Sequence, residues 1–71
     1  MRGDPKSVFG KHLAALRHAR GWSQEELASE SGLSRRYISD VERGRRNIGL
    51  CNLCRLADAL RIPLGKLMSI D

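Results

Sequence analysis

The hydrophobic residues of this 71-residue chain recur at helical spacing, and no stretch alternates as a half-buried strand does. Phe9, Leu13 and Leu16 lie four and then three residues apart, as on one face of a helix. This pattern predicts a first helix over about residues 6–20. Gly10 costs the interior of that helix roughly 1 kcal/mol relative to alanine, so we expect another segment to pack closely against it.

Two short helices with similar start signals are predicted next. Ser23 and Glu26 have the spacing of a capping box, in which each side chain binds the other residue's backbone amide. A second helix is therefore expected over about residues 24–31. Ser34 is a good N-cap for a third helix over about residues 35–43. Two short helices joined by a tight turn form a helix-turn-helix pattern.

Two further helices complete an all-α fold. The fourth predicted helix carries four leucines at helical spacing: Leu50, Leu53, Leu56 and Leu60. Pro63 opens a short fifth helix that carries Leu64 and Leu67. A chain this short forms one small core, so we expect a single domain over residues 1–71, with residues 1–5 as a flexible tail.

Positive charge is concentrated where the helix-turn-helix is predicted. The chain has 13 Lys and Arg against 8 Asp and Glu, a net charge of +5, and a mean hydropathy of −0.40. Residues 34–47 hold five arginines, one aspartate and one glutamate, and so carry +3 of that total. The overall charge balance favours a polyanionic partner, either nucleic acid or a membrane surface, over an acidic small molecule. With no membrane span or signal peptide in the sequence, we expect a cytoplasmic protein and no membrane partner.

The predicted third helix divides into an apolar face and a basic face. At 100° per residue, Ile38 and Val41 lie together on one side. The other side carries the polar residues Arg35, Arg36, Ser39, Asp40 and Arg43. Arginine can donate two hydrogen bonds to guanine, and serine can donate to or accept from several bases. This face therefore predicts base reading by Arg35, Arg36, Ser39 and Asp40 in the major groove of DNA.

Asp40 has two possible roles on that face. Its carboxylate can accept a hydrogen bond from cytosine N4. It can instead hold Arg36 and Arg43, which lie four residues before it and three after it, in fixed conformations. We favour this orienting role, because the helix already supplies the partners.

Most of the chain resembles a known family. The runs WSQEELASESGLSRRYISDVERGRRN and LCRLADALRIPLGKLM resemble the phage-repressor-like, Xre-type helix-turn-helix proteins. That family includes Cro and lambda-type repressors and the controller proteins of restriction–modification systems. The resemblance implies a compact five-helix, lambda-repressor-like DNA-binding domain with its helix-turn-helix at about residues 24–43. It also implies a transcriptional regulator that binds a palindromic double-stranded DNA operator as a homodimer.

The resemblance extends to individual residues around the DNA surface. It implies an ion pair between Arg17 and Glu42 that bridges the first and third helices. It leaves two roles open for Tyr37, contact with the DNA backbone or packing. The residues that it places at or near phosphate are Arg17, Gln24, Ser34, Tyr37, Arg43, Arg45, Arg46 and Asn47. Arg35 and Arg36 stand where several repressors carry paired glutamines, which shifts the expected target from adenine towards guanine.

Two protein-contact surfaces are also predicted. The last segment has more apolar residues than so short a helix needs for its own core. We expect these residues to be exposed and to form the dimer interface: Ile62, Leu64, Leu67, Met68 and Ile70. Glu25, Glu26 and Glu30 form an acidic side of the second helix. A solvated structural face is the default reading, and the alternative is a contact with RNA polymerase, which some family members make from this helix.

Other functional classes have weaker support in the sequence. Cys51 and Cys54 form a single CxxC pair, and His12 and His18 lie far from it, so we expect no metal site and no cofactor. Cys54 is expected to fill space beside the core, and Cys51 to be partly exposed. No nucleophile–base motif or phosphate loop is present, so we do not expect an enzyme. The alternatives are an antitoxin that regulates its own promoter and a nonspecific nucleoid or RNA binder.

Overall fold

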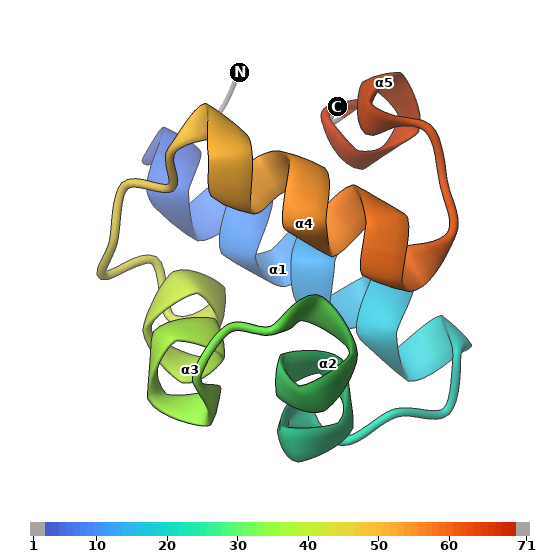
Figure 1. Ribbon diagram of the computed structural model, residues 1–71. Helices are drawn as coiled ribbons and strands as arrows, with labels where there is room; N and C mark the ends of the chain where they lie inside the picture. The colour runs from blue at the N-terminus through green and yellow to red at the C-terminus, as the bar shows by residue number, and fades with distance from the viewer. Residues whose placement is uncertain (1–2, 70–71) are drawn as a thin grey trace.

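The computed structural model describes residues 3–69, and these form an all-helical domain (Figure 1). The helices are α1 (Pro5–Ala19), α2 (Gln24–Ser31), α3 (Arg35–Glu42), α4 (Leu50–Leu60) and α5 (Leu64–Leu67). No strand occurs within the described range. Of the described helices, none is long and apolar enough to cross a membrane.

The helix starts follow the predicted capping residues. Ser23 Oγ accepts from the Glu26 amide at 3.1 Å, and Glu26 Oε1 accepts from the Ser23 amide at 2.8 Å, which confirms the capping box. Ser34 Oγ caps α3 by accepting from the Tyr37 amide at 3.0 Å. The expected tail over residues 1–5 is too long, because Asp4 caps α1 and Pro5 is its first residue.

One apolar cluster joins all five helices. Its fully buried side chains are Leu13, Leu27, Ile38, Val41, Leu56, Leu60 and Leu67. Around this cluster α1 packs on α3, α2 packs on both α3 and α4, and α5 packs on α4. Since α2 and α3 are short, their helical structure is stabilised mainly by packing in this shared core and less by intrinsic helix propensity.

Gly10 marks the closest approach of α1 to α3. A methyl group on its Cα would overlap the backbone oxygen of Val41 and lie 2.5 Å from that of Glu42. The predicted close packing at Gly10 is therefore confirmed. The carboxyl end of α3 rests directly on the backbone of α1, which sets the position of the whole third helix.

Two expectations about exposure are wrong. Leu67 has no exposed surface and belongs to the protein's own core, because the single turn of α5 turns this side chain back onto α4. Cys54 is exposed rather than packed beside the core, since it lies about 100° round the helix from the buried Leu53.

Candidate DNA-binding interface

The turn between α2 and α3 has the geometry that a helix-turn-helix requires. Gly32 ends α2 with φ at 76°, in the left-handed region that glycine adopts without strain. Ser34 then starts α3 two residues later. Leu27 of α2 and Ile38 of α3 are fully buried, so the two helices share the core.

The outer face of α3 carries the predicted base-reading residues. Arg35 and Arg36 are exposed on its first turn, and Ser39 and Asp40 are partly exposed on the next. Ile38 and Val41 are buried on the opposite side, with 0% and 1% of their surfaces exposed. The two-faced helix predicted from the sequence is therefore confirmed, while the assignment of its outer residues to DNA bases stays a prediction.

Asp40 does not hold its neighbouring arginines. Within residues 3–69 the ion pairs are Lys6–Asp4 and Arg17–Glu42, so Asp40 pairs with neither Arg36 nor Arg43. An exposed pair gains little Coulomb energy and must immobilise two side chains, which explains why the arginines extend into solvent. The favoured orienting role is therefore not observed, and base contact remains the alternative for this carboxylate.

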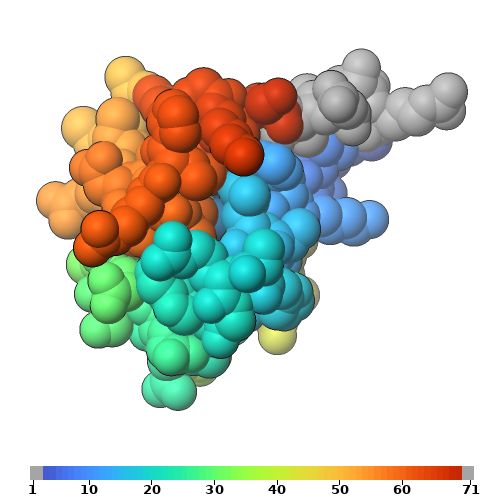
Figure 2. Space-filling model, turned by 90° about the vertical axis from the view of Figure 1, so that its right-hand side faces the viewer, coloured from blue at the N-terminus to red at the C-terminus, as the bar shows by residue number. Residues whose placement is uncertain are grey.

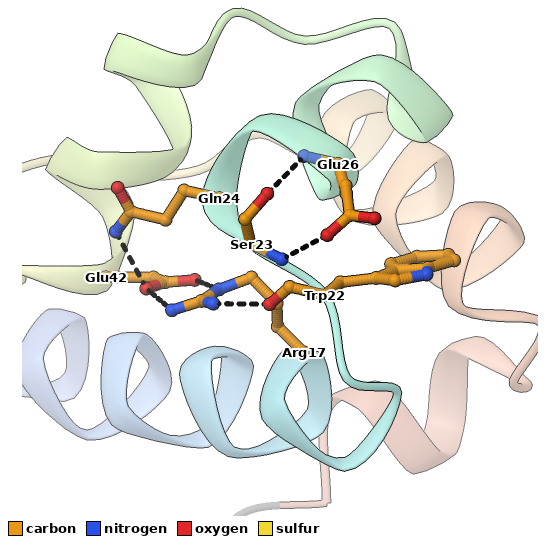
Figure 3. Close-up of polar contacts among 6 residues, drawn as sticks. All are labelled: Arg17, Trp22, Ser23, Gln24, Glu26 and Glu42. Atoms are coloured by element: carbon orange, nitrogen blue, oxygen red, sulfur yellow. Dashed lines mark hydrogen bonds and ion pairs between the residues drawn. The ribbon is translucent and has the colours of Figure 1, made fainter.

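A buried ion pair fixes α3 against α1, as the resemblance implied (Figure 3). Arg17 Nε donates to Glu42 Oε2 at 2.8 Å, and a terminal nitrogen donates to Glu42 Oε1 at 2.9 Å. The other terminal nitrogen donates to the backbone oxygen of Trp22 at 2.7 Å. The hydrogen bond with Glu42 holds the pKa of Arg17 above its ordinary value, although burial opposes this.

Arg17 positions helices through hydrogen bonds within the protein. Only 9% of its side chain is exposed, and all three guanidinium nitrogens donate inside the protein. The implied ion pair is confirmed. Arg17 ties α3 and the segment before α2 to α1, and its implied closeness to phosphate stays a prediction.

Gln24 belongs to the same network. Its side-chain amide donates to Glu42 Oε1 at 3.0 Å, so the Glu42 carboxylate joins α1, α2 and α3 (Figure 3). The Gln24 side chain is partly exposed at the first position of α2, where the positive end of the helix dipole lies. One amide hydrogen is used internally, and the other is available to a phosphate oxygen.

The loop after α3 presents the remaining predicted phosphate contacts. Arg43, Arg45, Arg46 and Asn47 are all exposed. Gly44, with φ at 74°, lets this loop pass so close to α1 that a Cβ there would lie 2.5 Å from Ser7 Oγ. The cationic loop is thus held beside the start of α1.

Tyr37 contacts this loop through the side chain of Arg46. Its ring lies 4.8 Å from the Arg46 guanidinium carbon, and its hydroxyl accepts from Asn52 Nδ2 of α4 at 3.0 Å. The ring also packs against the core, which favours the packing role left open for it. Asn52 was missed from the sequence, because no local spacing connects a residue of α4 with one of α3.

The predicted dimer surface is smaller than expected. Met68 is 48% exposed, and Ile62 and Leu64 are partly buried against the core. Ile62 lines a shallow cavity of about 230 Å³ between α1 and the segment that follows α4, on the side of the molecule seen in Figure 2. Leu67 is buried, and Ile70 lies outside the described residues.

The acidic side of α2 is exposed to solvent, as predicted. Glu25, Glu26 and Glu30 are all exposed, but the Glu26 carboxylate is engaged in the capping box. A structural role is therefore confirmed for Glu26. Glu25 and Glu30 make up the rest of this surface, and their contact with another protein stays a prediction.

The fold and this surface define a helix-turn-helix protein. A family model described as helix-turn-helix matches residues 13–67, and the chain belongs to this family, HTH_3. The family consists of DNA-binding transcription regulators, which confirms the predicted Xre-type resemblance and the fold class.

Several known proteins are similar over most of the chain. The hypothetical transcription factor of Neisseria meningitidis is 43% identical over 65 residues, which are 92% of this chain and 61% of that protein. The restriction–modification controller protein C.AhdI of Aeromonas hydrophila is 50% identical with a TM-score of 0.85, over 87% of this chain and 94% of that one. The controller protein C.Esp1396I, solved as a tetramer with its 35-base-pair operator, is 28% identical with a TM-score of 0.80, over 94% and 97% of the two chains.

Proposed function

We propose that this protein is a transcriptional regulator that binds a palindromic operator as a homodimer, with α3 in the major groove. The observation that carries the proposal is the exposure of Arg35 and Arg36 together on the first turn of α3. This is where a recognition helix makes its base contacts. Both guanidinium groups can donate two hydrogen bonds to guanine, so we expect G·C pairs in each half-site.

A surrounding set of donors would fix the helix on the DNA backbone. Gln24 and the Ser34 hydroxyl lie at the N-termini of α2 and α3, where helix dipoles favour a phosphate. Arg43, Arg45, Arg46 and Asn47 would follow the same strand from the loop. Tyr37 would act through Arg46, whose guanidinium lies over its ring.

The relatives support a regulator related to controller proteins. C.AhdI is a restriction–modification controller protein, and C.Esp1396I was solved as a tetramer on operator DNA. In helix-turn-helix dimers the half-sites lie one helical turn apart, about 34 Å. We expect the same spacing for this protein, with Met68, Ile62 and Leu64 at the two-fold contact.

Selection of bound sites from a random duplex pool tests the proposal. We expect enrichment of an inverted repeat with guanines at equivalent places in both halves, and its loss when Arg35 and Arg36 are both changed to alanine. A pool that stays random while the protein still binds it would contradict the proposal. It would favour a nonspecific nucleic-acid binder instead.

An activating contact with RNA polymerase would use Glu25 and Glu30, because Glu26 is engaged in the capping box. We expect Glu30→Lys to lower transcription from an activated promoter while operator affinity stays within about twofold. Such a change is expected to leave the fold intact, since surface substitutions usually alter stability by less than about 0.5 kcal/mol. Unchanged activation with unchanged operator binding would leave the acidic face with a structural role only.

A further inference from the structure

The two cysteines lie on a part of α4 that the DNA-binding surface does not use. Both are exposed, at the second and fifth positions of the helix. Leu53, Leu56 and Leu60 form the buried side of α4, so both thiols point away from the core. Cys51 and Cys54 therefore form an accessible dithiol on one helical surface.

The spacing of the two cysteines on the helix favours binding of a shared metal ion over formation of a disulfide. Side chains three residues apart on a helix have Cβ atoms about 5–6 Å apart. A disulfide requires about 3.5–4.5 Å between these atoms, so it would distort the first turns of α4. Two thiolates that share a soft ion, each about 2.3 Å from it, have sulfurs as much as roughly 4–4.6 Å apart. That separation is reached from a regular helix by side-chain rotation alone.

The number of ligands then selects the ion. Among the residues that the structure describes, no group of three or more His, Cys, Asp or Glu could hold a metal ion. Structural zinc takes four protein ligands, so this pair cannot complete the coordination of zinc with other residues of the range 3–69. Monovalent copper is soft, prefers thiolates and is satisfied by two of them.

We infer that Cys51 and Cys54 form a two-coordinate site for monovalent copper on the surface of α4. Binding replaces two S–H bonds with two Cu–S bonds, and both protons leave to solvent without a change of oxidation state. The product is a bis-thiolate complex with a net charge of −1.

Copper binding is expected to stabilise the start of α4. Gly49 is the N-cap of this helix and offers no side-chain hydrogen bond, so its first amides lack the support that Ser23 and Ser34 give α2 and α3. An ion held by Cys51 and Cys54 would clamp consecutive turns together. Amide hydrogen exchange in residues 50–54 should slow when Cu⁺ is bound.

A competition titration tests the site. Reduced full-length protein is titrated anaerobically with Cu⁺ against a chromophoric Cu⁺ chelator, and native mass spectrometry gives the stoichiometry. We expect one Cu⁺ per chain, and a loss of about 10²-fold or more in affinity for Cys51→Ser and for Cys54→Ser, because each removes the chelate advantage. Both variants alter only an exposed thiol, so circular dichroism and DNA binding should be unchanged.

A matched variant separates chelation from capture by any exposed thiol. Cys54→Ser combined with Asp58→Cys keeps two thiols on exposed positions but places them seven residues apart, about 10.5 Å along the helix. We expect this variant to bind Cu⁺ no better than Cys54→Ser alone. Equal affinity for this variant and the wild type would overturn the proposal. So would Zn²⁺ bound more tightly than Cu⁺, or one ion shared between two chains.

Discussion

Glu42 is a single residue that connects the helices behind the candidate DNA-binding interface. Its carboxylate accepts hydrogen bonds from Arg17 and Gln24, so one side chain sets the relative positions of three helices. Its own side chain is only 7% exposed, and Arg17 is nearly as buried. A buried pair of this kind contributes little net free energy while it is intact, but removing one partner leaves the other charge uncompensated.

We expect Glu42→Ala to lower the free energy of unfolding by about 3–5 kcal/mol, measured by urea denaturation. The control is Arg17→Met with Glu42→Leu, which removes both charges and should recover much of the loss. A loss below about 1 kcal/mol for Glu42→Ala would mean that the pair is effectively solvated.

The raised pKa of Arg17 also gives an expectation for pH. A group whose pKa rises on folding stabilises the protein while it is protonated, and this contribution disappears only as the pH rises through the folded-state pKa. The folded-state pKa of an arginine lies far above neutral pH. Comparing the denaturation midpoints of the wild type and the Arg17→Met, Glu42→Leu double variant, which leaves no uncompensated carboxylate, should therefore show a constant difference between about pH 6 and 9.

Base reading and phosphate contact are separated by two arginine substitutions. We expect Arg35→Ala to weaken binding to the selected operator by about 1–3 kcal/mol and to leave binding to random DNA nearly unchanged. Arg45→Ala should weaken both alike and reduce the salt slope by about one unit. Gel-shift titrations at several salt concentrations measure both effects, and equal losses on both DNAs for Arg35→Ala would rule out its assignment to bases.

At the level of helices, the contact between α1 and α3 determines the position of α3, the proposed recognition helix. Gly10 is the point at which α1 meets the backbone of Val41 and Glu42. The neighbouring backbone carbonyls cannot rotate away as the end of a flexible side chain would. Any side chain at residue 10 must therefore push the two helices apart.

We expect Gly10→Ala to destabilise the fold by about 1–3 kcal/mol, the usual cost of overpacking a tight site, and to weaken operator binding as well. Gly65→Ala is the matched control, since it also replaces a helical glycine but a Cβ there meets nothing within 4 Å. Thermal unfolding and gel-shift assays check both variants. A neutral Gly10→Ala would show that the helices separate at little cost.

The helices were predictable because their start signals are local. Ser23, Glu26 and Ser34 act within one turn of their own positions, so the sequence specifies these caps almost directly. Contacts between helices were harder to predict from the sequence. The Asn52–Tyr37 hydrogen bond and the Arg20 contact with the Leu60 carbonyl join distant segments with no fixed spacing.

Burial was predicted correctly for α3 and incorrectly for one residue each of α4 and α5. The angular positions of Ile38 and Val41 fixed the inner side of α3, but four residues of α5 give no period to read. Leu67 was therefore placed on the wrong side. Cys54 is different, because its angle from Leu53 on α4 already indicated an exposed position.

At the level of the whole molecule, the proposed operator binding would depend on how two copies meet. A domain of this size has a small core, and a dimer contact would add buried apolar area. Met68 is the most exposed of the described apolar residues in the proposed interface, with Ile62 and Leu64 beside the core.

We expect Met68→Glu to raise the dimer dissociation constant about tenfold or more and to weaken operator binding, while the monomer stays folded. Placing a charge at the centre of an apolar contact costs several times RT. Leu50→Glu is the control, since Leu50 is 67% exposed and lies outside the proposed interface. Sedimentation equilibrium compares the two variants. Unchanged self-association for Met68→Glu would place the interface elsewhere.

The hydrogen bonds that Glu42 accepts from Arg17 and Gln24 also limit which substitutions can be accepted during evolution. Residues 17, 24 and 42 come from separate helices, yet Arg17 and Gln24 both donate hydrogen bonds to the carboxylate of residue 42. A library randomised at these positions and selected for operator binding should return combinations rather than independent choices. Arg35 and Arg36, which project from the same helix into solvent, should vary freely with the operator supplied. If the outer face of α3 reads the operator as proposed, its residues can change with the target sequence while residues 17, 24 and 42 are kept together.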